Sequence, residues 1–62
     1  EYAILFSVET ELKNEPNNSS EQIVVLHEGT KVRVLEEQDD WRLVRLADGK
    51  EGWLPKVEIK IL

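Results

Sequence analysis

Apolar and polar residues alternate along much of this chain with a period of two, the spacing expected of strands that bury one face. The clearest example is Lys31 to Glu36, in which charged residues alternate with valines. Trp41 to Leu46, Glu51 to Leu54 and Val57 to Leu62 are shorter segments with the same strand-like composition. The pattern therefore predicts a protein made of short β-strands.

The first apolar segment, Tyr2 to Val8, carries apolar residues on both parities. Ala3 and Leu5 occupy one parity. Four larger apolar residues share the other: Tyr2, Ile4, Phe6 and Val8. We therefore predict a first strand over this segment that continues irregularly to Leu12.

Turn-forming residues separate these segments. Lys13 to Gln22 contains proline, three asparagines and two serines, and it predicts a long polar loop whose middle, Glu15 to Ser20, is the most mobile internal segment. Ala47 to Lys50 contains the Asp-Gly signature of a tight hairpin, which predicts that the flanking strands are antiparallel neighbours. Glu37 to Asp40 is predicted as an acidic turn, and Pro55 ends a strand because proline cannot donate to a ladder.

No segment sustains the apolar stripe of a helix. The nearest rival is Gln22 to Glu28, but its β-branched run, Ile23 to Val25, favours a strand. The pattern predicts an all-β domain of five short strands, arranged as a small barrel or two orthogonal sheets, with no more helix than a 3₁₀ turn near Pro55. The predicted core is apolar: Ile4, Phe6, Val25, Val32, Val34, Val44, Leu54 and Ile59.

The chain has 62 residues, which is enough for one domain, and we assign residues 1–62 to it. It begins at Glu1 and contains no methionine, which indicates a piece excised from a longer protein. Cysteine is absent, so disulfides and cysteine-based zinc sites are excluded, and the single histidine, His27, disfavours a histidine-based metal site. We expect neither a metal nor another cofactor, and stability must come from apolar packing and strand pairing.

Charge narrows the range of partners. Thirteen acidic residues against eight basic ones give a formal net charge of −5, and the sequence contains no basic run. Binding to nucleic acid or to anionic lipid depends on lysine and arginine, so neither is the expected partner. The longest apolar run, Tyr2 to Phe6, is far shorter than the roughly 20 residues of a transmembrane helix, so we do not expect this segment to insert into a membrane.

Three ordered motifs in the second half of the chain resemble bacterial SH3 domains. They are Gly-x-x-Val at Gly29 to Val32, Trp-x-x-Val at Trp41 to Val44, and Asp-Gly-x-x-Gly-Trp-Leu at Asp48 to Leu54. The resemblance covers about Tyr2 to Ile61 and implies a small five-stranded, partly open SH3-like barrel. The run from Leu26 to Val32 also resembles the C-terminal SH3-like domain of Bat-type aerotolerance proteins, which carry tetratricopeptide repeats.

The resemblance implies a ligand groove. Three residues match groove positions of eukaryotic SH3 domains: Trp41, Trp53 and Pro55. The loop from Lys13 to Gln22 corresponds to their RT loop. Glu58 stands where those domains have a groove tyrosine, and Leu5 and Ser7 stand where two more are expected. Because recognition of proline-rich peptides depends on an aromatic-lined groove, the sequence argues against ordinary polyproline binding.

Two interpretations of Trp41 and Trp53 are open at this point. They either cover the barrel structurally or form a partly exposed platform with Pro55 on one outer surface, which binds a ligand or a neighbouring domain. Four carboxylates are predicted to lie along the edge of that surface: Glu36, Glu37, Asp39 and Asp40. These carboxylates either face water or favour a basic flank of the ligand, and they lack the spacing of a calcium-binding loop.

No catalytic motif is present, because nothing places a nucleophile or a paired carboxylate beside His27, and the glycines are too sparse for a phosphate-binding loop. We therefore predict a non-catalytic docking module of a larger bacterial cell-envelope protein. Its partner is a protein or peptide segment, including the tetratricopeptide region of its own parent chain. The alternative is a module that binds peptidoglycan peptide, as some bacterial SH3 relatives do; a nucleic-acid function ranks third. We expect an extracytoplasmic location for this domain, and this expectation rests on the family resemblance alone.

Overall fold

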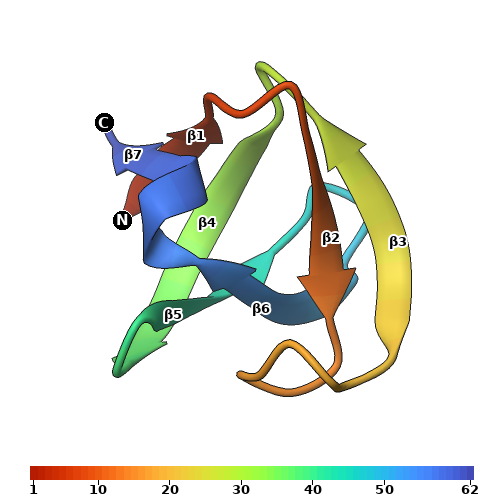
Figure 1. The fold of residues 1–62 in the computed structure, drawn as a ribbon. Coiled ribbons are helices and arrows are strands. Elements are labelled where there is room, and N and C mark those ends of the chain that lie inside the picture. Colours follow the sequence, from red (N-terminus) through yellow and green to blue (C-terminus); the bar gives the residue numbers. More distant parts are fainter.

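The computed structural model describes every residue of the chain, 1–62, and consists of seven short strands in one curled sheet (Figure 1). The strands in chain order are β1 (Tyr2–Leu5), β2 (Glu9–Lys13), β3 (Gln22–His27), β4 (Lys31–Gln38), β5 (Trp41–Arg45), β6 (Glu51–Pro55) and β7 (Ile59–Ile61). The one helical element is a 3₁₀ turn, η1 (Lys56–Glu58), directly after Pro55. No helix in the structure has the length and apolar character needed to cross a membrane.

The strands follow the order β3-β2-β6-β5-β4-β1-β7, and every pairing between neighbours is antiparallel. The sheet curls around a single core without closing, since β3 and β7 each have one free edge (Figure 1). The all-β, partly open, SH3-like architecture is therefore confirmed. The strand count is seven rather than the predicted five. The sequence has six strand-like segments, one more than that prediction, and the first of them breaks over Phe6 to Val8 into β1 and β2.

The prediction for β1 is wrong about which parity faces the core. Ala3 and Leu5 are buried, whereas Ile4 is only partly buried and Phe6 leaves 53% of its surface exposed. Ala3 pairs with Val32 of β4, which faces the core, and cross-strand partners lie on the same side of a sheet. The register with β4 therefore turns Ala3 and Leu5 toward the core, and β1 ends at Leu5, before Phe6.

The core is otherwise close to the prediction. Five predicted residues are buried: Val32, Val34, Val44, Leu54 and Ile59. Val25 is only partly buried, because it pairs with Glu11 on the outer face of the β2–β3 hairpin while its neighbour Leu26 faces inward. Leu12 of β2 is fully buried as well, so β2 contributes Leu12 and β3 contributes Leu26 to the core.

The predicted hairpin at Asp48-Gly49 is confirmed, with β5 and β6 as antiparallel neighbours. Gly49 takes a φ of 95°, a left-handed conformation that glycine adopts without a steric penalty. The amide of Leu46 donates to the carbonyl of Lys50 over 2.8 Å and closes the loop. This hairpin sets the register between β5 and β6, the two strands that contain Trp41 and Trp53.

The hairpin between β4 and β5 is tighter than the predicted acidic turn. Strand β4 continues to Gln38, which pairs with Trp41, so only Asp39 and Asp40 remain in the turn. Asp39 takes a φ of 54°, in the left-handed region that aspartate tolerates better than most residues. The register shifts at Leu35, where β4 carries one extra residue.

Strand β2 crosses close to β6 at Gly52. A Cβ atom at that position would lie 2.6 Å from Leu12 Cγ and 2.8 Å from the carbonyl oxygen of Lys13. Only glycine leaves room for this approach, which brings the outer residues of β2 beside the β5–β6 hairpin.

Candidate ligand-binding groove

The outer face of the β5–β6 hairpin is apolar. Trp41 lies opposite Pro55 and Leu43 lies opposite Trp53, while the alternate residues Val44 and Leu54 face the core. Residues opposite one another, and residues two apart on a strand, share a face of the sheet. The register therefore brings the two tryptophans and Pro55 to one surface, and all three are partly exposed rather than buried.

A groove of about 330 Å³ opens beside Trp41 and Pro55 and is bounded on its other side by β2. Its remaining lining is mostly polar: Glu9, Thr10, Glu11, Lys13, Asn18, Val25 and Glu58. Trp53 does not line the groove. It pairs instead with Lys13 of β2, so only one of the two tryptophans lines the space where a ligand would lie.

Two hydrogen bonds fix the Pro55 end of the groove. The amide of Lys56 donates to the carbonyl of Asp40 over 2.8 Å, which ties η1 to the residue before Trp41. The hydroxyl of Ser7 donates to the carboxylate of Glu58. Ser7 and Glu58 stand at two positions where the resemblance implies groove tyrosines, so a polar pair replaces an aromatic wall here.

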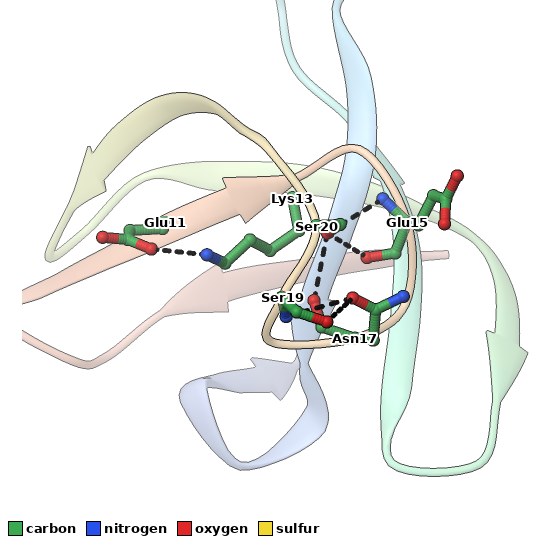
Figure 2. Close-up of polar contacts among 6 residues, drawn as sticks. All are labelled: Glu11, Lys13, Glu15, Asn17, Ser19 and Ser20. Carbon is green, nitrogen blue, oxygen red and sulfur yellow. Dashed lines mark hydrogen bonds and ion pairs between the residues drawn. The ribbon is translucent and has the colours of Figure 1, made fainter.

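The loop between β2 and β3 contributes Asn18 to the groove lining. Most hydrogen bonds of this loop join its own residues (Figure 2). The hydroxyl of Ser20 lies 3.0 Å from the carbonyl oxygens of both Glu15 and Asn17, and it accepts from the Glu15 amide over 3.3 Å. The side-chain oxygen of Asn17 accepts from both the amide and the hydroxyl of Ser19. The loop is mostly exposed, and its predicted mobility stays a prediction.

The groove carries more negative than positive charge. Lys13 Nζ lies 2.7 Å from Glu11 Oε1, and the lysine side chain is only 14% exposed (Figure 2). Glu9 and Glu58 add two more carboxylates with no lysine or arginine at ion-pair distance. A basic group on a ligand would therefore meet favourable charge next to an indole face.

None of the four carboxylates predicted for the groove edge lines the groove. Glu37 lies opposite Arg42 and accepts from its Nε over 2.8 Å, with Lys56 Nζ 3.4 Å away. The hydrogen bond from Arg42, helped by the charge of Lys56, lowers the pKa of Glu37 below its ordinary value of 4.5. Glu36 lies opposite Leu43 on β4, and the edge role of all four residues stays a prediction.

The sequence-based prediction does not include the groove carboxylates of β2, because it continues the first strand irregularly to Leu12. The segment in fact alternates strictly, with Thr10 and Leu12 buried and the charged residues on the outer face. That alternation is visible in the sequence, and it is the pattern from which a strand with outward-facing charged residues can be predicted.

A sequence model of the bacterial SH3 domain matches residues 9–60, so the chain belongs to the bacterial SH3 family. The match includes every residue that lines the groove. A comparison with curated proteins finds no match. The narrower resemblance to Bat-type aerotolerance proteins is not supported by these comparisons. Membership of this family suggests a non-catalytic binding module.

Proposed function

We propose that this bacterial SH3 domain is a non-catalytic docking module that holds a protein or peptide segment in the groove beside Trp41. The observation that carries the proposal is the composition of the groove. One side offers an indole and a proline, and the other offers the carboxylates of Glu9 and Glu11. An apolar side chain supplies contact area with the indole, and a basic side chain pairs with the carboxylates.

The occupant differs from an ordinary proline-rich ligand. Proline-rich segments need several parallel aromatic walls, and the groove has one tryptophan and a hydrogen-bonded Ser7–Glu58 pair. An extended segment with a lysine or arginine beside an apolar residue suits this combination better. Such a segment is supplied by a partner protein or by the parent chain of the domain.

We place the parent protein in the bacterial cell envelope. Support comes from the family, since bacterial SH3 domains are often extracellular or associated with the cell wall. The run from Leu26 to Val32 is the basis for a tetratricopeptide-containing parent, and docking onto such a region is the intramolecular form of the same proposal.

A second candidate is binding of peptidoglycan peptide. The acidic lining of the groove favours it, because cell-wall peptides carry amino groups that carboxylates such as Glu9 and Glu58 attract. The two candidates share the groove and differ in the ligand, so titration separates them.

The test is calorimetric titration of the 62-residue chain with the remainder of its parent protein and, separately, with purified muropeptides. Binding to the parent protein alone supports docking, and binding to muropeptides alone supports the cell-wall candidate. Trp41→Ala is expected to weaken either interaction at least tenfold, the loss typical of a central aromatic anchor.

Phe6→Ala is the matched control, because it removes an aromatic ring that is 53% exposed and does not line the groove. It should change the affinity less than twofold. Circular dichroism must show that both variants remain folded. Equal losses in the two variants would show that the Trp41 groove is not the binding surface.

A further inference from the structure

Three basic side chains have no carboxylate partner, although carboxylates outnumber basic groups in this chain. Five of the eight lysines and arginines lie within ion-pair distance of an aspartate or glutamate: Lys13, Arg42, Arg45, Lys50 and Lys56. The three that do not are Lys31, Arg33 and Lys60. In a chain with thirteen acidic residues, these three are the exception to be explained.

Strand register gathers these three residues on one surface. Ile4 of β1 lies opposite Lys31 of β4 on one side and opposite Lys60 of β7 on the other. In the next outward-facing row, Tyr2 lies opposite Arg33, and Arg33 lies opposite Arg45 of β5. These basic residues are not consecutive in the sequence, and strand pairing brings them together. We call Lys31, Arg33, Arg45 and Lys60 the basic face.

A hollow of about 380 Å³ lies on this face and shares no residue with the Trp41 groove. Its lining consists of three basic residues, Lys31, Arg33 and Arg45, and three uncharged residues, Tyr2, Leu46 and Ala47. The Nζ of Lys31 lies 4.7 Å from the centre of the Tyr2 ring, a cation–π contact that leaves the ammonium without a counter-ion. Arg45 donates to Glu51 over 2.6 Å, so Arg33 is the guanidinium with no partner.

Arg33 faces a like charge across the sheet, although the ion pair of Arg45 with Glu51 offsets part of the repulsion. Like charges placed directly opposite one another on antiparallel strands repel, and Arg33 lies opposite Arg45. Neither the core nor a hydrogen bond requires Arg33, which is exposed. Arg33 is thus an exposed guanidinium with no internal partner, and a carboxylate from outside would pair with it.

We propose that the basic face binds an extended acidic peptide segment, independently of the Trp41 groove. Lys31 and Arg33 are two residues apart on β4, so their side chains are spaced about 7 Å apart along the strand. Carboxylates at alternate positions of an extended peptide have the same spacing. Arg33 can hold one carboxylate with two parallel hydrogen bonds, and Tyr2 and Leu46 provide apolar contact between the charges.

A peptide fits this face better than a nucleic acid does. The hollow spans only two rows of side chains, whereas a phosphate backbone continues far beyond them. Beyond the hollow, that backbone would meet a chain with a net charge of −5. A short acidic segment places its charge only where the cations are.

The probe is a blocked peptide in which three glutamates alternate with threonine, titrated into the 62-residue chain at low ionic strength and followed by amide chemical shifts. We expect the largest shifts on β4 at Lys31 to Arg33. Arg33→Gln should weaken binding at least fivefold. Trp41→Ala should leave the affinity unchanged, because the two surfaces share no residue.

Lys56→Gln is the matched control, since it removes the same charge from a residue that lines neither the hollow nor the groove. It should weaken binding less than twofold. The proposal is overturned by an absence of binding at millimolar peptide, by equal binding of the glutamine version of the peptide, or by equal effects of Lys56→Gln and Arg33→Gln. Tighter, Arg33-dependent binding of an oligothymidylate of the same charge would assign the face to nucleic acid instead.

Discussion

Leu5 and Phe6 are neighbours in the chain, but only Leu5 belongs to the core, with 1% of its surface exposed against 53% for Phe6. Leu5→Ala should lower the free energy of unfolding by about 2–4 kcal/mol, because it removes buried methyl groups and leaves a cavity. Phe6→Ala should cost less than about 1 kcal/mol. Urea denaturation of both variants measures the difference, and a larger loss for Phe6→Ala would mean that β1 faces the other way.

Glu37 makes a pH-dependent contribution to stability. Its pKa is lowered in the folded state by the hydrogen bond from Arg42 and the charge of Lys56, below the ordinary value of 4.5. A carboxyl group with a lowered pKa stabilises the fold above its unfolded pKa, and this stabilisation is lost as the pH falls through the folded pKa. Glu37→Gln should therefore destabilise the domain near neutral pH and have little effect in strong acid.

Thermal unfolding of Glu37→Gln at a series of pH values checks this prediction. Glu36→Gln is the control, because it removes a carboxylate from the same strand with no ion-pair partner. The effect should be small, since Glu37 is exposed and solvent screens its charges. A Glu37→Gln effect that does not change with pH would show that the interaction with Arg42 and Lys56 is not responsible.

At the scale of elements, the crossing of β2 over β6 depends on Gly52. Gly52→Ala should destabilise the fold by about 1–3 kcal/mol, because the added carbon meets the Leu12 side chain and the Lys13 carbonyl. Gly49→Asn, at the hairpin turn, has open space and a residue type that tolerates positive φ, so it should cost less. Chemical denaturation compares the two, and equal stability of Gly52→Ala and wild type would contradict this close approach.

The β2–β3 loop is held by Ser20, whose hydroxyl contacts both Glu15 and Asn17 (Figure 2). Ser20→Ala should accelerate amide exchange over the loop and weaken ligand binding in the groove, because Asn18 is no longer held in place. The cost in stability should stay below about 1.5 kcal/mol. Ser19→Ala removes a single hydroxyl contact and should have a smaller effect; identical exchange rates in Ser20→Ala and wild type would contradict this role.

Strands with apolar residues on one parity only could be predicted from the sequence, together with the face that they bury. Where both parities carry apolar residues, the buried face could not be predicted. The alternation at Lys31 to Glu36 and the Asp48-Gly49 turn predicted β4 and the β5–β6 hairpin correctly. In Tyr2 to Val8 both parities are apolar, so the side facing the core depended on the register with β4, which the sequence does not encode locally.

The same limit applies to the candidate site. The hairpin turn fixed the pairing of Trp41 with Pro55, so their common surface followed from local sequence. The opposite side of the groove comes from β2, which is distant in the chain and reaches the hairpin only through the crossing at Gly52. The basic face likewise depends on β1, β4, β5 and β7 together, which no local pattern predicts.

In the whole molecule, the two hollows differ in the sign of the charge that lines them. The Trp41 groove carries the carboxylates Glu9, Glu11 and Glu58, and the basic face carries the cations that have no internal partner. If both proposals hold, ligands of opposite charge bind at different places on one small domain. Both interactions should weaken as salt is added, because both surfaces are open to solvent.

The groove beside Trp41 is the proposed docking surface of this domain, and the two indole groups report on it. The chain contains only two tryptophans, so an ¹⁵N-labelled sample gives two indole N–H signals, which Trp53→Phe assigns. The most direct test follows both signals while the remainder of the parent protein is added. We predict that the Trp41 signal shifts and saturates together with the amides of β2. Saturable binding that leaves the Trp41 indole and the β2 amide signals unshifted would show that the ligand docks elsewhere.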